Sequence, residues 1–269
     1  MYNDFYGLQE PPFNITPDPR FLFYSDRHRE AYQHLLFGIR ERKGFIQITG
    51  EVGAGKTTLC RAVLEELGSS FRTALILNPC MTIEQLLRTI LREFGLEAPE
   101  DRVACLEILN RFLLEQLALE NDVVLLIDEA QDMDFELLEQ IRLLSNLETD
   151  QRKLLQIVLI GQPELRERLN ERRLRQLRQR ITVRYHLTPL SRVETANYIY
   201  HRLHVAGGNG RPGFSSWAVR KIHRYSGGVP RLINAVCDKA LLCGFVTGKD
   251  YLDAGHVRRA IRELEGDFV

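Results

Sequence analysis

Residues 50–57 read GEVGAGKT, a glycine-rich loop that ends in a lysine and a threonine. An apolar stretch suited to a strand, Phe45–Thr49, precedes the loop, and a helical pattern, Thr58–Leu67, follows it. Glycines let the backbone bend until several N–H groups face one anion, and the N-terminus of the next helix favours the same negative charge. The pattern therefore predicts a phosphate cradle between a strand and a helix.

The side chains at the end of the loop have separate chemical roles in such a cradle. Lys56 is expected to reach the β- and γ-phosphates as a catalytic cation, and the Thr57 hydroxyl to ligate Mg²⁺. The predicted ligands of the protein are therefore ATP and Mg²⁺. The residues predicted to contact the nucleotide here are Gly50, Glu51, Val52, Gly53, Ala54, Gly55, Lys56, Thr57 and Thr58.

A pair of carboxylates follows a second apolar stretch. Asp128 and Glu129 come directly after Val123–Ile127, at the edge of a sheet where ligands bind in open α/β proteins. Asp128 is predicted to join Thr57 in holding the metal ion, and Glu129 to activate the attacking water. Taken alone, such a pair equally suits a helix cap and a solvated acid. Beside the glycine loop it favours ATP hydrolysis over phosphate transfer to another acceptor, for which no acceptor site is found.

Strands and helices alternate through the first two thirds of the chain. Runs such as VVLLI suit strands that are buried on both faces, which indicates a parallel sheet covered by helices. Thr82 and Gln85 form a capping box before a regular apolar stripe that ends at Phe94. The predicted fold class is thus an α/β P-loop NTPase. Its five expected strands are Phe45–Thr49, Arg72–Leu77, Val123–Ile127, Leu154–Ile160 and Ile181–Leu187.

The pattern changes to helices only after Pro189. Ser191 and Glu194 form another capping box, and the linker Ala206–Gly213 is rich in glycine. We expect helices over about 192–205, 215–225, 230–244 and 254–265. The predicted domains are a P-loop core with an N-terminal arm, residues 1–188, and a small all-helical lid, residues 189–269.

The N-terminal arm carries an unusual number of prolines. Pro11, Pro12, Pro17 and Pro19 predict an extended or turning segment over the first twenty residues, with no helix. Ser25 is expected to cap the helix that follows, whose apolar face ends at Ile39.

The composition is that of an ordinary globular protein. The 269 residues are 44% hydrophobic and 27% charged, enough for a core domain and a smaller one. Lys+Arg and Asp+Glu are both 36, so the net charge of zero gives no general attraction to nucleic acid or anionic membranes. The five cysteines are widely spaced without a C-x-x-C pair, which favours small core residues in a reducing cytoplasm. Apolar runs are strand-sized, and we expect neither a signal peptide nor a membrane span.

Two further segments are rich in features that suit phosphate recognition. Residues 164–184 carry eight arginines, which suit a solvated helix face, a nucleic-acid surface or a source of one arginine for a neighbour's nucleotide. In the segment GGVPR, residues 227–231, Pro230 suits the first position of a helix. Arg231 then opposes the helix dipole, which indicates an anionic partner such as a phosphate.

The chain resembles the AAA+ ATPases, and among them the general secretion pathway protein A family, also described as ExeA-like. TniB-type transposition ATPases are more distantly similar. The resemblance covers nearly the whole chain, and its first and last segments are more specific than the glycine loop. Those segments are FYGLQEPPFNITPDPRFLFYSDRHREAYQHLLFGI, GEVGAGKTTL, LLIDEAQ, IRLLSNLETD, IVLIGQPEL and GGVPRLIN.

The resemblance assigns roles to residues that match its motifs. Lys56 and Thr57 correspond to Walker A, and Asp128 and Glu129 to Walker B. Gln162 falls at the sensor-1 position, where Asn or Thr is commoner.

Three further roles also follow from the resemblance. Arg231 matches sensor 2 of the lid. Arg180 is the preferred arginine finger, with Arg178 as the alternative. Phe13 and the neighbouring arm are expected to line the adenine pocket.

The family also implies a biological setting. The resemblance implies an ATPase that changes conformation in type II secretion (the general secretion pathway) or in cell-envelope or exopolysaccharide assembly. It implies a homo-oligomer that acts in the cytoplasm, or at the inner membrane through a membrane-anchored partner. Secretion relatives continue into a transmembrane helix and a peptidoglycan-binding domain, so we expect either an excised ATPase domain or a short soluble relative. The alternative is an ATP-dependent DNA-binding adaptor of the transposition-regulator type, which the neutral net charge disfavours.

Overall fold

The computed structural model describes residues 1–14, 18–149 and 152–266. Its contacts divide the chain into two compact units, which we describe separately. The sheet unit comprises Arg29–Gly50 and Leu59–Leu187, and the helical unit comprises Met1–His28, Glu51–Thr58 and Thr188–Val269. The sequence grouped the arm and the glycine loop with the sheet, whereas their contacts group them with the C-terminal helices. The domain bounds of 1–188 for the core with its arm and 189–269 for the lid stay a prediction.

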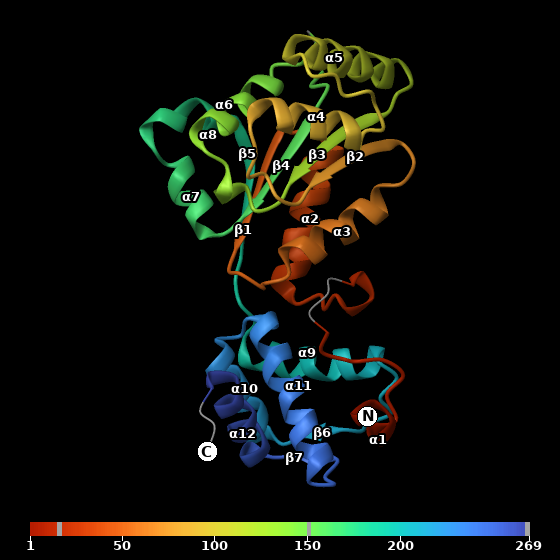
Figure 1. The fold of residues 1–269 in the computed structure, drawn as a ribbon, viewed down its shortest axis with the longest axis vertical. Helices are drawn as coiled ribbons and strands as arrows, with labels where there is room; N and C mark the ends of the chain where they lie inside the picture. Colours follow the sequence, from red (N-terminus) through yellow and green to blue (C-terminus); the bar gives the residue numbers. More distant parts are fainter. Residues whose placement is uncertain (15–17, 150–151, 267–269) are drawn as a thin grey trace. The chain divides into compact units, whose positions relative to one another are not determined.

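Five parallel strands form one sheet within the described residues, in the order β2-β3-β4-β1-β5 (Figure 1). The three central strands are almost wholly buried, which explains why their sequences are mainly apolar, while the edge strands β2 and β5 are partly exposed. All five predicted strands are confirmed to within two residues at each end. Their bounds are β1 Phe45–Gly50, β2 Phe71–Ile76, β3 Asp122–Ile127, β4 Gln156–Gly161 and β5 Ile181–Leu187.

Helices cover both faces of the sheet. Gly38 in α2 lies so close to β1 and β5 that an added Cβ would come within 2.7 Å of Ile46, so this face admits no side chain there. On the other face, one apolar cluster joins the sheet to the helices from α4 to α8. The predicted capping box of Thr82 and Gln85 is confirmed. The helices that accompany the sheet are α2 Asp26–Arg40, α3 Lys56–Leu67, α4 Ile83–Glu93, α5 Arg102–Ala118, η2 Ala130–Asp132, α6 Phe135–Leu144, α7 Pro163–Leu169, η3 Arg172–Leu174 and α8 Arg175–Arg180.

The helical unit has its own apolar core, which the arm and the C-terminal helices share. The four predicted helices are present, and the capping box of Ser191 and Glu194 is confirmed. A two-residue parallel pair, β6 with β7, adds strands that the helices-only prediction missed, because so short a pair leaves no periodic pattern. The elements are α1 Tyr2–Tyr6, η1 Pro19–Phe21, α9 Arg192–Val205, β6 Gly213–Phe214, α10 Ser216–Ser226, α11 Pro230–Val246, β7 Tyr251–Leu252 and α12 Ala254–Glu265. Over the described ranges, no helix is both long and apolar enough to cross a membrane.

The prediction of an arm without helix is wrong at its two ends. Residues 2–6 precede the prolines and form α1, which Gly7 ends in the left-handed conformation with φ of 71°. The ring of Phe5 packs edge-on against Phe245 of α11, so tertiary contacts stabilise this short helix. Pro19 occupies the first position of a 3₁₀ turn, where its missing N–H costs no hydrogen bond. Pro17 lies outside the described residues.

A buried arginine fastens the arm to α9. Arg202 is only 7% exposed, and its guanidinium donates to the carbonyl of Pro12 and, at 3.1 Å, to that of Asn14. The same group lies 4.5 Å from the centre of the Phe21 ring and donates to the Tyr198 hydroxyl at 3.2 Å. All three nitrogens of the Arg202 guanidinium therefore donate hydrogen bonds within one plane. A lysine ammonium would not reproduce this geometry.

We expect Arg202→Met to lower the free energy of unfolding by about 1–3 kcal/mol, because the buried Pro12 carbonyl and the Asn14 carbonyl would both lose a charged donor. Urea unfolding measures this, and hydrogen exchange of the arm amides should quicken in the same variant. Arg192→Met, at an exposed position of the same helix, is the matched control. Equal stability of the two variants would contradict a fastening role.

Candidate active site

The glycine loop adopts the sharp turns that its sequence predicts. It connects β1 to α3, and Gly53 and Gly55 have φ of 78° and 94°, values that side chains disfavour. The Ala54 N–H donates to the Glu51 carbonyl at 3.1 Å, which closes a turn. Lys56 is 6% exposed, and its ammonium donates to the same Glu51 carbonyl at 3.0 Å. The lysine predicted to meet the phosphates is thus folded back on its own loop.

A histidine that the sequence analysis missed supports this loop. His28 is 4% exposed, and its Nε2 lies 3.0 Å from the Ala54 carbonyl oxygen. Its Nδ1 lies 2.7 Å from the Ser25 hydroxyl, and its backbone N–H donates to the same oxygen, which confirms Ser25 as a helix cap. A single histidine in a helical pattern gives no sequence signal of this contact, because its partner is 26 residues away.

The surroundings of His28 keep its ring neutral. Burial is the main cause that lowers the pKa of His28, and the hydrogen bond to Ala54 opposes that shift. A carbonyl oxygen only accepts, so Nε2 carries the proton and donates to Ala54. Nδ1 then accepts from the Ser25 hydroxyl. The neutral His28 ring therefore supports the glycine loop through its hydrogen bond to Ala54.

Arg231 lies against the loop within the same unit. Its backbone N–H, in the first turn of α11, donates to the Gly53 carbonyl at 3.2 Å. A Cβ on Gly53 would come within 2.3 Å of the Arg231 Cβ, so this contact requires glycine. The preceding turn is equally tight, because a Cβ on Gly228 would meet the Leu190 carbonyl oxygen at 2.0 Å. The segment GGVPR thus brings Arg231 beside the predicted phosphate cradle.

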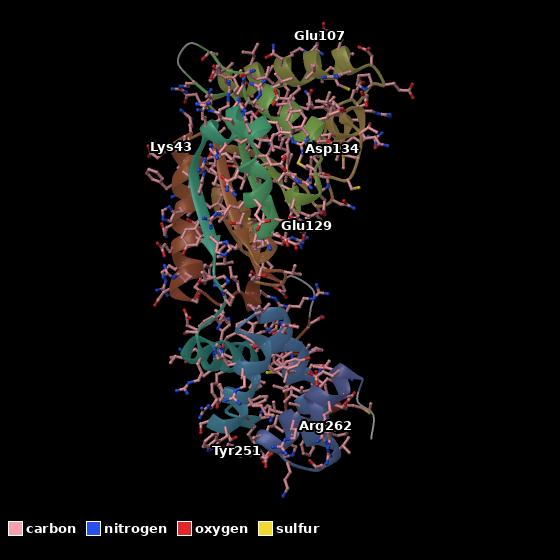
Figure 2. The ribbon with its side chains drawn as sticks, turned by 90° about the vertical axis from the view of Figure 1, so that its left-hand side faces the viewer. Lys43, Glu107, Glu129, Asp134, Tyr251 and Arg262 are labelled. Carbon is pink, nitrogen blue, oxygen red and sulfur yellow. The ribbon has the colours of Figure 1, made fainter. Side chains whose placement is uncertain are left out.

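The two carboxylates occupy the carboxyl end of β3 in the sheet unit, where Figure 2 labels Glu129. Asp128 is 3% exposed, and its Oδ1 accepts the Glu129 backbone N–H at 2.9 Å. Glu129 has a φ of 51°, a left-handed conformation that costs a residue other than glycine on the order of 1 kcal/mol. The chain therefore turns at Glu129 and does not continue in the extended conformation of β3.

Two amide side chains hold the Glu129 carboxylate. Gln131 donates to Glu129 Oε2 at 2.7 Å, and Gln162 donates to the same oxygen at 3.2 Å. The Gln131 Oε1 also accepts the backbone N–H of Gln162 at 3.0 Å. Gln131 therefore links the end of β3 to the end of β4. Its role was missed although it stands in the segment LLIDEAQ, because its partner Gln162 is 31 residues further on.

The two candidate finger arginines have different surroundings. Arg180, at the end of α8, donates to the Ser145 hydroxyl at 2.8 Å. Arg178 donates to the Asn170 side chain at 3.3 Å. The arginine-rich segment is also no single basic helix, because α7, η3, α8 and β5 divide it. The choice between the two arginines stays a prediction.

Other predicted roles also remain predictions. Phe13 is 2% exposed in the core of the helical unit, and its expected contact with adenine is untested. Thr57 belongs to the helical unit and Asp128 to the sheet unit, so their shared metal ion also remains an expectation.

The fold defined by this sheet order, the glycine loop after β1 and the carboxylates after β3 is that of the AAA-type P-loop ATPases. A family described as "AAA domain" matches residues 39–169. Solved structures show the same fold at low identity. The ORC2 protein of Aeropyrum pernix is 18% identical with a TM-score of 0.69, covering 97% of this chain and 73% of its own. The Drosophila ORC bound to DNA is 19% identical with a TM-score of 0.71, covering 94% and 64%. A Thermotoga maritima RuvB variant is 17% identical with a TM-score of 0.62, covering 90% and 69%.

A much closer relative identifies the family. The general secretion pathway protein A of Aeromonas hydrophila is 48% identical over 270 aligned residues, which cover 99% of this chain. This chain belongs to the general secretion pathway protein A family. It spans about half the length of that relative, 49%.

We expect the stability of the protein to fall as the pH drops below about 6.5, the ordinary pKa of histidine. The folded state holds His28 neutral while the unfolded chain takes up its proton, so acid favours unfolding over the interval between the two pKa values. His28→Gln keeps an N–H for Ala54 but removes the titration. It should reduce the pH dependence of the unfolding free energy by up to about 1.4 kcal/mol per pH unit.

Urea unfolding between pH 5 and 8 measures this difference. His34→Gln is the matched control, because His34 is an exposed residue of the same helix. If the unfolding free energy has the same pH dependence in His28→Gln and His34→Gln, a neutral His28 in the folded state is contradicted.

Proposed function

We propose that this protein is an ATPase that converts ATP and water to ADP and phosphate, with Mg²⁺ as cofactor. The observation that carries the proposal is the Glu129 carboxylate, held by Gln131 and Gln162 at the carboxyl end of a buried parallel strand. A carboxylate fixed at this edge suits the activation of a water molecule. An enzyme that transfers phosphate to another acceptor has no need of it.

The donor atoms of Thr57 and Asp128 fit the expected metal ion. A hydroxyl and a carboxylate are hard oxygen ligands of the kind that Mg²⁺ prefers. When bound, Mg²⁺ would neutralise phosphate charge. Lys56, whose ammonium donates to the Glu51 carbonyl in this structure, would reach the β- and γ-phosphates of ATP. The loop N–H groups and the N-terminus of α3 would bind the same phosphates.

Glu129 has one carboxylate oxygen committed and one available. Both amide donors bind Oε2, and over the described residues no hydrogen bond reaches Oε1. Oε1 is thus the oxygen that would accept a proton from the attacking water, while Gln131 and Gln162 fix the carboxylate plane. Gln131 is accordingly a positioning residue for this step.

ATP turnover would drive conformational change in a secretion or cell-envelope assembly system, including exopolysaccharide export. The 48% identity to the general secretion pathway protein A of Aeromonas hydrophila supports this setting. We propose a homo-oligomer in the cytoplasm, placed at the inner membrane by a membrane-anchored partner protein. Arg231 would sense the nucleotide from α11, because its backbone already contacts the loop at Gly53.

Glu129→Gln should lower phosphate release from ATP by at least about 100-fold while ATP binding persists, because the amide cannot take the proton. Gln131→Ala should lower kcat by about 10–100-fold with little change in KM, since it frees the carboxylate without touching ATP. Glu136→Gln, an exposed acid in the first turn of α6, is the control. Full activity in Glu129→Gln would remove the proposed base.

Arg180 should act on the nucleotide of a neighbouring copy. Arg180→Ala and Glu129→Gln should each be inactive alone, whereas an equimolar mixture should recover part of the phosphate release. In the mixture, Glu129 of one variant meets Arg180 of the other. The same mixture with Arg178→Ala tests the alternative finger. Wild-type activity that is linear in protein concentration, with no recovery on mixing, would indicate a self-contained site.

A further inference from the structure

The sheet unit contains a polar pocket that is lined by none of the residues predicted to contact the nucleotide phosphates or the metal ion. It has a volume of about 330 Å³ and opens among β1, β5, α7 and α8. In Figure 1 these two helices lie at the side of the sheet that β5 forms. The pocket is near the lower end of the size range of small-molecule sites, and it exceeds the volume of one inorganic phosphate.

Three arginines from three different elements line this pocket. Arg166 comes from α7, Arg178 from α8 and Arg184 from β5, and no aspartate or glutamate is among the described lining residues. Arg184 donates to the backbone carbonyl of Arg178, and Arg178 donates to Asn170 at 3.3 Å, so two of the guanidiniums are held in place. Three guanidinium cations with no carboxylate among the described lining residues repel one another. A bound anion would offset this repulsion.

The inner wall of the pocket is formed by two polar residues of β1. Gln47 and Thr49 are 5% and 2% exposed, on a strand whose other side chains are apolar. The Thr49 hydroxyl lies 3.0 Å from Nδ1 of His186. Within the described part of the chain, the Gln47 side-chain amide makes no hydrogen bond. Gln47 lines the pocket and its amide atoms are not fully enclosed by protein, so they are available to a polar ligand there.

We propose that this pocket binds a small phosphorylated anion. Guanidiniums match phosphate oxygens through paired N–H groups, and the Gln47 amide and Thr49 hydroxyl add neutral hydrogen bonds at the base. The pocket shares no residue with the glycine loop. The two are adjacent in sequence, however, because Thr49 stands two positions before Glu51. Occupancy would therefore stabilise the strand from which the loop emerges.

Isothermal titration with inorganic pyrophosphate, without Mg²⁺ and at constant ionic strength, tests the proposal. The full chain carrying Lys56→Ala is used, so that phosphate binding at the glycine loop is weakened at the outset. In that background we expect one binding site. Adding Arg166→Gln with Arg184→Gln should weaken pyrophosphate binding at least about ten-fold, because two charged donors are lost.

The matched control is Arg172→Gln with Arg175→Gln in the same background. These two arginines belong to the same segment, are exposed and do not line the pocket, and the net charge changes equally. The control should bind within about two-fold of the parent, since exposed charges that do not contact the anion are screened by salt. Equal weakening by both pairs would replace the pocket with general electrostatic attraction.

A second variant keeps every charge and guards against misfolding. Gln47→Leu retains the volume of the side chain but removes its amide, and it should weaken pyrophosphate binding without lowering the melting temperature. Unchanged affinity in Gln47→Leu, or no pyrophosphate binding in Lys56→Ala, would overturn the proposal. Because binding is read in the Lys56→Ala background, failure here leaves the proposed ATPase function untouched.

Discussion

Parallel pairing of β1 with β4, and of β4 with β3, is the constraint on which the candidate active site depends. The three strands are buried on both faces, so a shift of one residue in register would move every side chain to the opposite buried face. The pairing brings the ends of the strands to one edge, where Gly50 begins the glycine loop and Asp128 follows β3. At the end of β4, a Cβ on Gly161 would meet the Gln131 oxygen at 2.8 Å. The sheet thus brings the carboxylate pair and its amide supports to one edge, where side-chain hydrogen bonds join them.

The glycine loop is stabilised through its carbonyl groups. The Glu51 carbonyl accepts from Lys56, the Gly53 carbonyl from the Arg231 backbone, and the Ala54 carbonyl from His28. Each donor comes from a different part of the helical unit or from the loop itself. A loop that must present N–H groups to an anion has to satisfy its carbonyls elsewhere, and these three contacts achieve that. The start of α2 and the start of α11 therefore contribute to the cradle together with its glycines.

The sequence allowed prediction of the features that depend on local pattern. Apolar runs located all five strands, and capping boxes located the starts of α4 and α9. The family resemblance is confirmed by the 48% identity to general secretion pathway protein A. The supports of the site could not be predicted, because His28, Gln131 and Arg202 act on partners that only the fold brings near. The short helix α1 was missed because the nearby prolines predict an extended segment. Its stabilising contact with α11 depends on the fold and leaves no signal in the sequence.

The arginine-rich segment shows why a charge pattern alone does not define a function. Its arginines share one stretch of sequence, yet Arg180 bonds to Ser145, Arg173 stacks on Phe135 and pairs with Glu171, and Arg178 lines a pocket. A helix face for DNA would require these side chains to present one continuous basic surface. The change from α7 through η3 and α8 to β5 disperses them instead. Arg166, Arg178 and Arg184 lie together with the Gln47 amide around a pocket of about 330 Å³, which is within the size range of small-molecule sites.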